Sequence, residues 1–184
     1  MRLLGISGSL RRGSYNTKLL HAAAELLFDD VEFEIWDGLK AVPPYDQDDD
    51  CEPAPAAVAR LRDSIAGADA ILFATPEYNS SVPGQLKNAV DWASRPLATN
   101  VLRNKPTAVV GASTGMFGAV WAQAELRKVL AATGARVLDA ELPVPHAQTR
   151  FDEEGRLVDD EIRAGLAEVV FGLVDETVPV AAAA

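Results

Sequence analysis

The feature that most constrains the fold is an alternation of short apolar runs with amphipathic helical patterns along the chain of 184 residues. Each of five apolar runs is followed by a pattern of helical spacing, which is typical of a parallel sheet with helices on both faces. The expected strands are residues 2–7, 31–36, 70–75, 107–111 and 135–138. The expected helices carry apolar stripes at residues 19–27, 58–65, 86–93, 122–130 and 162–173.

Five strand–helix units of this kind leave few arrangements, because crossovers between parallel strands are right-handed. The common order is 2-1-3-4-5, in which the direction of winding reverses between strands 1 and 3. Residues 31–36 alternate strictly in polarity, which indicates an edge strand with one exposed face. We therefore expect an α/β fold with one domain over residues 1–177, followed by a frayed, low-complexity tail over residues 178–184.

Composition and charge exclude several classes of function. Hydrophobic residues make up 48% of the chain and charged residues 24%, which is ordinary globular composition. No apolar run has membrane-spanning length, and a net charge of −10 disfavours nucleic-acid binding. The single cysteine, Cys51, excludes a disulfide framework, and the two histidines suggest no metal centre. We expect a cytoplasmic protein without metal, membrane or nucleic-acid partners.

The segment after the first expected strand concentrates positive charge in this acidic chain. Residues 1–24 hold four basic residues and no acidic one, whereas residues 25–55 hold 11 acidic residues and one lysine. Residues 8–17 combine hydroxyls, glycines and two arginines at a helix N-terminus, which suits a phosphate group. The dinucleotide pattern G-x-G-x-x-G is absent, and Ser14 stands where a P-loop needs lysine. Asn16 is either an anion ligand or the helix cap.

Two further polar segments follow the third and fourth expected strands. We expect them to lie beside residues 8–17, at the point where the strand order reverses. Residues 75–88 contain two prolines and a glycine and form a stiff turn, in which Tyr78 offers an aromatic face. Residues 112–118 are mostly small, and Met116 and Phe117 could form an apolar wall for a ring. The alternatives are a rigid surface turn for the former segment and helix capping for the latter. Ligands of open α/β sheets bind at this edge, so we expect a ligand with a phosphate and a planar ring.

Residues 8–16 and 76–92 resemble the two hallmark segments of the NADPH-dependent FMN reductase family. The resemblance implies a flavodoxin-like three-layer sandwich with a five-stranded parallel sheet of order 2-1-3-4-5. It implies FMN as cofactor and NADPH or NADH as electron donor. The FMN phosphate would be held by Ser9, Arg11, Ser14, Tyr15 and Asn16. The isoalloxazine ring would be lined by Pro76, Glu77, Tyr78, Asn79 and Ser80, and its surroundings would be completed by Ser113, Thr114 and Gly115.

A bound flavin would carry out the chemistry, since the chain has no nucleophile elbow and no Ser-His-Asp arrangement. The resemblance implies an FMN-dependent NAD(P)H oxidoreductase whose small-molecule acceptor is a quinone, or else free flavin, an azo dye or chromate. The alternatives are an electron carrier or flavin-binding regulatory module without rapid NAD(P)H oxidation, and a phosphate-binding module without redox function. We expect Glu77 to contact the ring through its backbone, because a carboxylate facing the ring would oppose negative charge on it.

The resemblance also implies a homodimer or a homotetramer. Trp92 and Trp121 lie off the core stripes of their helices. Large aromatic side chains at such positions are either packed at a rim or buried by a partner. We therefore expect a partner subunit to cover both.

Overall fold

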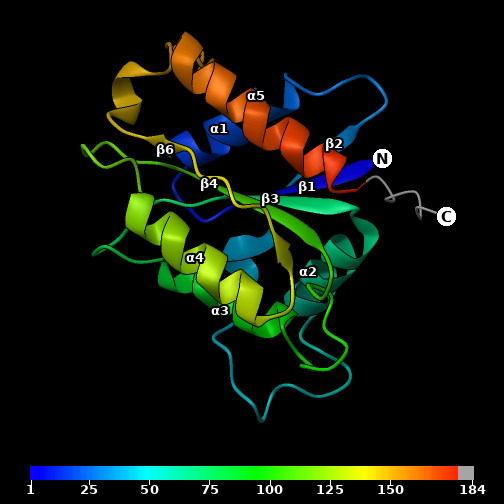
Figure 1. Cartoon of the computed structure of the whole chain (residues 1–184). Coiled ribbons are helices and arrows are strands. Elements are labelled where there is room, and N and C mark those ends of the chain that lie inside the picture. The colour runs from blue at the N-terminus through cyan, green and yellow to red at the C-terminus, as the bar shows by residue number, and fades with distance from the viewer. Residues whose placement is uncertain (178–184) are drawn as a thin grey trace, which may run out of the picture.

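The computed structural model describes residues 1–177, and the expected tail over residues 178–184 lies outside the described residues. A parallel sheet lies between two layers of helices (Figure 1). The strands are β1 (Arg2–Ser7), β2 (Glu32–Trp36), β3 (Ala70–Ala74), β4 (Pro106–Ala112), β5 (Arg136–Val137) and β6 (Pro143–Val144). The α-helices are α1 (Tyr15–Ala24), α2 (Ala56–Gly67), α3 (Gly84–Ala93), α4 (Val120–Ala132) and α5 (Asp160–Asp175). Two short 3-10 helices are η1 (Gly38–Ala41) and η2 (Ala147–Thr149).

The strand order is β2-β1-β3-β4-β5, and all of these pairs are parallel, which confirms the expected flavodoxin-like arrangement. The sheet differs from the expectation by a sixth short strand, because β5 pairs only with the first two residues of the seven-residue β4. At the other end of β4, the strand β6 pairs with the same edge of β4, so that Gly111 lies opposite Pro143 and Ala112 opposite Val144. A two-residue strand that contains proline leaves no recognisable pattern in the sequence.

Alternate side chains of the central strands enter two separate cores. Leu4 and Ile6 of β1 face the layer of α2, α3 and α4, whereas Leu3 faces the layer of α1 and α5. Both layers are visible on opposite sides of the sheet in Figure 1. Burial on both faces explains why β1 and β3 are continuous apolar runs. At the edge, β2 leaves Glu32 and Glu34 exposed, as its alternating sequence predicts.

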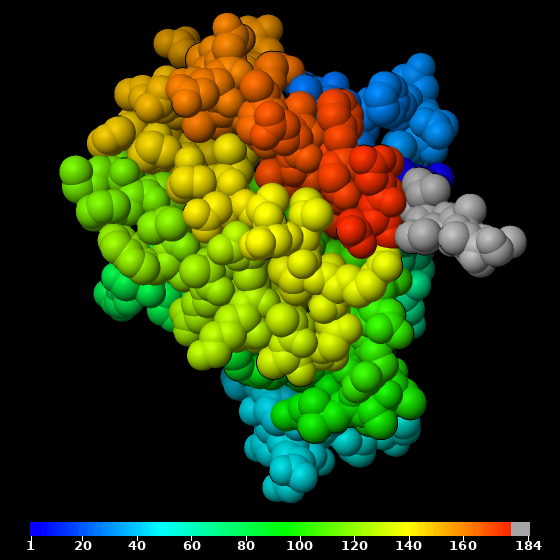
Figure 2. Space-filling view, viewed as in Figure 1, coloured from blue at the N-terminus to red at the C-terminus, as the bar shows by residue number. Residues whose placement is uncertain are grey.

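The acidic loop over residues 43–55 projects from the molecule beside α2 and α3 (Figures 1 and 2). Its first residues cover Trp92, whose Nε1 donates to the carbonyl of Pro43 at 2.9 Å. The ring of Tyr45 meets the indole of Trp92 edge-on, with centroids 4.9 Å apart. Trp92 is therefore fully buried within its own chain. The expectation that a partner covers Trp92 is wrong, because this loop fills that role.

The fold brings the three polar segments together at one edge of the sheet. Because the strands are parallel, their carboxyl ends lie on one side, at the left of Figure 1, while the N-terminus lies on the other. The connections after β1, β3 and β4 meet on that side. Within residues 1–177, no helix has the length and apolar character needed to cross a membrane.

Candidate functional site

A cavity of about 290 Å³ opens at the carboxyl ends of β1, β3 and β4, near the lower limit for small-molecule sites. We call it the switch-point cavity. Ten of the thirteen residues predicted as cofactor ligands line it, namely Ser9, Arg11, Ser14, Tyr15, Asn16, Pro76, Glu77, Tyr78, Ser113 and Thr114. The predicted residues Asn79, Ser80 and Gly115 do not line it. Ala112, the last residue of β4, also lines it, although its apolar side chain gives no signal of this in the sequence.

One end of the cavity is built by loop one (residues 8–14) and the start of α1. The helix begins at Tyr15 because the Oγ of Ser14 accepts a hydrogen bond from the amide of Thr17 at 3.2 Å. The N–H groups of Tyr15 and Asn16 have no acceptor within the helix, since the first turn of an α-helix leaves its amides free. The helix dipole adds partial positive charge at the same place. This end of the cavity is therefore suited to an anion.

Arg11 adds a full positive charge to that end. Its side chain folds back over loop one, where Nη2 donates to the carbonyl of Gly13 at 2.8 Å. Its Cζ lies 5.4 Å from the centroid of the Tyr15 ring, within the range of a cation–π contact. No acidic side chain within residues 1–177 forms a salt bridge with Arg11. The guanidinium thus lines the cavity with its charge available to a ligand.

Asn16 joins two walls of the cavity. Its Nδ2 donates to the carbonyl of Ala112 at 3.0 Å, and its Oδ1 accepts from the amide of Ala112 at 2.9 Å. Both residues are buried, so α1 and the end of β4 are held together by two paired hydrogen bonds. The alternative that Asn16 caps the helix is wrong, because Ser14 is the cap.

Loop two (residues 75–83) is fixed to α4 by a carboxylate from the loop. The residue before α4, Ala119, has no side chain that could cap the helix. Instead, Oε2 of Glu77 accepts from the amides of Trp121 and Ala122 at 3.0 and 3.1 Å. The carboxylate of Glu77 is engaged by the helix N-terminus, where negative charge is favourable.

A second carboxylate fixes the same loop from the helix side. Oε2 of Glu125 accepts from the Oγ of Ser81 at 2.6 Å and from the amide of Val82 at 3.1 Å. The hydrogen bond from Ser81 is the main cause that lowers the pKa of Glu125, and the bond from Val82 adds to it. Glu77 and Glu125 therefore form a reciprocal pair of attachments, which we call the carboxylate clamp. Sequence reasoning missed Glu125, because it lies 44 residues from Ser81 in the chain.

Loop three (residues 113–119) is supported from β6 and α4. The backbone of Ser113 donates to β6 and accepts from η2, at 3.1 and 3.0 Å. The fully buried Gln123 donates to the carbonyl of Gly118 at 3.2 Å and accepts from the amide of Leu142 at 3.0 Å. The sequence offered one signal for Gln123, a polar residue beside the apolar stripe of α4. These contacts fix the loop from its inner side.

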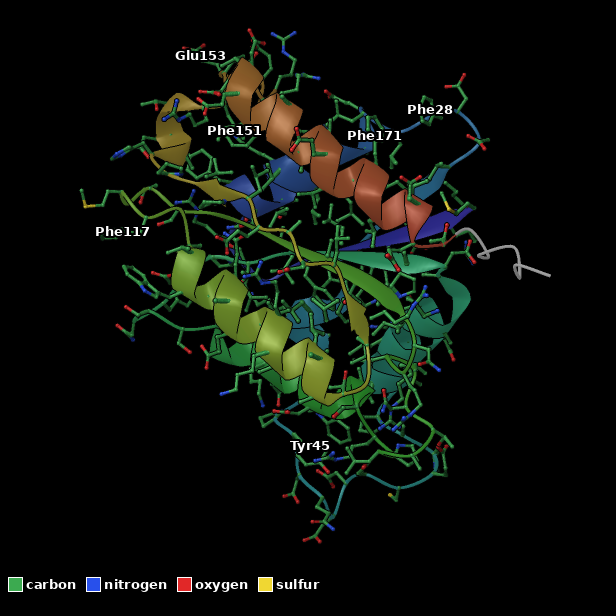
Figure 3. All side chains as sticks on the ribbon, in the orientation of Figure 1. Phe28, Tyr45, Phe117, Phe151, Glu153 and Phe171 are labelled. Atoms are coloured by element: carbon green, nitrogen blue, oxygen red, sulfur yellow. The ribbon has the colours of Figure 1, made fainter. Side chains whose placement is uncertain are left out.

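The outer side of loop three carries exposed apolar side chains. Met116 and Phe117 are 66% and 53% exposed and do not line the cavity, so the expectation that they form a wall for a ring is wrong. The reason is that the inner side of the loop is occupied by its contacts with β6. Phe117 lies at the outer edge of the molecule, as Figure 3 shows. Its ring packs against Trp121 with centroids 4.7 Å apart, and Trp121 is itself 45% exposed.

The cavity combines cationic and amide donors at one end with proline, tyrosine and loop backbone at the other. Within the described residues, no group of three or more His, Cys, Asp or Glu side chains is placed to hold a metal ion. The donors fit a phosphate, and the region between loops two and three fits a planar ring. The arrangement therefore suits a flat cofactor with an anionic arm, which FMN is.

Comparison with known proteins gives consistent results. The model of the family described as NADPH-dependent FMN reductase matches residues 1–149. An NAD(P)H-dependent FMN reductase of Pseudomonas aeruginosa is 46% identical over 164 residues, which are 89% of this chain and 88% of the relative. A 2-hydroxy-1,4-benzoquinone reductase of a Burkholderia species is 40% identical over the same shares of the two chains. The solved structure of the FerB flavoenzyme NAD(P)H:(acceptor) oxidoreductase of Paracoccus denitrificans superimposes with a TM-score of 0.83 at 35% identity, covering 96% of each chain.

Proposed function

The chain belongs to the NADPH-dependent FMN reductase family, and from this premise we propose that the switch-point cavity is its FMN site. As a member of that family it is an oxidoreductase that uses FMN and takes electrons from NAD(P)H. Loop one holds the phosphate, and loops two and three border the ring. The observation that carries this proposal is the gathering of Arg11, the capped start of α1 and the two loops around one cavity.

Within this site the chain binds and orients, while the cofactor supplies the redox chemistry. When bound, FMN would supply the hydride-transfer chemistry between NAD(P)H and the acceptor. Arg11 and the free amides of Tyr15 and Asn16 hold the phosphate by charge-assisted hydrogen bonds. The carboxylate clamp fixes loop two against α4, and it directs the negative charge of Glu77 to the helix and not to the ring. That arrangement favours electron density on the ring.

The acceptor in this proposal is a quinone, and the protein acts in the cytoplasm. The acceptor class is supported by relatives that are named quinone reductases. One of them is named 2-hydroxy-1,4-benzoquinone reductase. A planar quinone and a nicotinamide can use the same opening beside Tyr78, which is exposed at the rim of the cavity. Donor and acceptor must then alternate, so the double-reciprocal plots for the two substrates should be parallel.

Anaerobic addition of NADPH to the FMN-loaded protein tests the proposed function. We expect rapid bleaching of the flavin absorbance and recovery of the colour on addition of a benzoquinone. A protein that binds FMN but keeps its colour with NADPH would support an electron carrier. A protein that fails to bind FMN would support a phosphate-binding module without redox function.

We further propose that the protein works as a homodimer or homotetramer. The support is the apolar cluster of Met116, Phe117 and Trp121, which is exposed beside the cavity and would be covered by a second subunit. Light scattering at micromolar concentration should give at least twice the mass of one chain. Phe117→Glu should lower that mass, and a monomeric mass for the unchanged protein would contradict the proposal.

A further inference from the structure

A second cavity of about 270 Å³ lies on the other side of loop one. It is built by the carboxyl ends of β1 and β2, by η1 and by one residue of α1. Ser9 and Arg11 line both this cavity and the switch-point cavity, so the two adjoin along loop one. We call the second one the β2 cavity. Nothing in the proposed binding of FMN requires it.

The β2 cavity combines an apolar floor with charges of both signs. Trp36 and Leu39 line it and are buried. Asp37 and Lys40 line it and are exposed. Within residues 1–177, neither Asp37 nor Lys40 takes part in a salt bridge. An apolar surface next to an unpaired carboxylate and an unpaired ammonium suits a ligand that carries a flat base, hydroxyl groups and a phosphate.

The position of Asp37 and Lys40 in the fold indicates which part of a ligand they would contact. β2 pairs with β1 as far as Trp36, and Asp37 is the next residue. In the Rossmann fold, which differs from this sheet in strand order and in its G-x-G-x-x-G turn, an acidic residue about 20 residues beyond that turn accepts a hydrogen bond from the adenosine ribose. In the Rossmann proteins that use NADPH, an arginine near that position accommodates the 2′-phosphate that distinguishes NADPH from NADH, and an ammonium group can supply the same charge. Lys40 lies three residues after Asp37 and lines the same cavity.

We propose that the β2 cavity binds the adenosine ribose of the electron donor. The ammonium of Lys40 holds the 2′-phosphate of NADPH, and Asp37 accepts a hydrogen bond from the free 2′-hydroxyl of NADH. The inference rests on the proposed function, because it assumes that the nicotinamide enters the switch-point cavity. One dinucleotide can then extend from that cavity across loop one into the β2 cavity. Asp37 and Lys40 together would let the protein use either donor.

Binding of a ligand without nicotinamide tests this inference independently of electron transfer. We would titrate the FMN-loaded protein with adenosine 2′,5′-bisphosphate in a calorimeter. Saturable binding is expected, and Lys40→Ala should weaken it by about tenfold or more, as for loss of a hydrogen bond between charged groups. The matched control is Lys128→Ala, which removes the same charge from an exposed position on α4 outside both cavities. Absence of binding, or equal losses in both variants, would overturn the proposal.

The two charged residues should also shift donor preference in opposite directions. Lys40→Ala should raise the ratio of the KM for NADPH to the KM for NADH by about tenfold. Asp37→Ala should lower the same ratio, because it removes the acceptor for the 2′-hydroxyl and a like charge near the 2′-phosphate. Equal ratios in both variants and in the unchanged protein would reject the β2 cavity as the ribose site while the proposed function stood. Failure of NADPH to reduce the FMN-loaded protein would instead reject the proposed function.

Discussion

Replacement of Asn16 by alanine should separate α1 from the end of β4 and lower the free energy of unfolding. In the folded protein the Asn16 amide forms hydrogen bonds of 3.0 and 2.9 Å to the carbonyl and amide of Ala112. The substitution removes both bonds. It leaves the N–H and C=O groups of Ala112, a residue that is only 2% exposed, without hydrogen-bond partners. The loss therefore includes the net value of two hydrogen bonds and the cost of the unpaired groups.

The expected magnitude follows from the position of Asn16 at the cavity. Two hydrogen bonds contribute about 1–3 kcal/mol in total, and each buried unpaired group costs about 1–3 kcal/mol. Because Asn16 lines an open cavity, water can reach Ala112 once the side chain is gone and recover part of that cost. We expect a loss of about 2–4 kcal/mol, which for a chain of this size lowers the Tm by roughly 4–16 °C.

Urea denaturation of the FMN-free protein measures this loss without the stabilisation that a bound ligand adds. Asn16→Asp should also destabilise, because a carboxylate cannot donate to the carbonyl of Ala112. Thr114→Ala is the control, since Thr114 is an exposed residue of the same cavity and forms no side-chain hydrogen bond within residues 1–177. A loss below about 1 kcal/mol for Asn16→Ala, or one equal to that of the control, would show that the two hydrogen bonds to Ala112 do not hold α1 to β4.

Three further outcomes are expected. The pKa of Glu125 is lowered from 4.5, so the stabilisation by its charge is present above that pH and is lost as the pH falls through the lower, folded-state pKa. Urea midpoints of the unchanged protein and Glu125→Gln should therefore differ most above pH 4.5 and converge below it. Gly118→Ala should destabilise by about 1–3 kcal/mol in the same assay, because the residue has a φ of +59° and a Cβ there would lie 2.6 Å from the amide of Val144. Cys51→Ala should keep most of the NADPH:quinone activity in a steady-state assay, since this exposed thiol lies outside both cavities.

The sequence predicted the elements whose signals are local. The buried runs of β1 and β3 and the alternating β2 follow from periodicity alone, and the reversal of strand order indicated where the three loops meet. The sequence could not predict contacts between distant segments. Glu77 caps a helix that starts 43 residues later, and Trp92 is covered by a loop about 50 residues earlier, so neither contact leaves a local pattern.

The outward position of Phe117 was unpredictable for a related reason. Its orientation depends on the backbone hydrogen bond between Ser113 of loop three and Val144 of β6, a strand of two residues. By contrast, the residues at the start of α1 were predictable, because a cap, a helix N-terminus and a cation lie within six residues of one another. Local chemistry is readable from sequence, whereas the orientation of a loop depends on its long-range support.

The affinities of the protein for FMN and for riboflavin, which lacks the phosphate, show directly whether loop one binds the phosphate. If Arg11 binds the phosphate, Arg11→Ala should weaken FMN binding by about 1.5–3 kcal/mol and leave riboflavin binding almost unchanged. Arg12→Ala, which changes the same charge at an exposed residue that lines neither cavity, serves as the control and should leave both affinities nearly unchanged. Equal losses of FMN and riboflavin affinity in Arg11→Ala would contradict the assignment of loop one as the phosphate site.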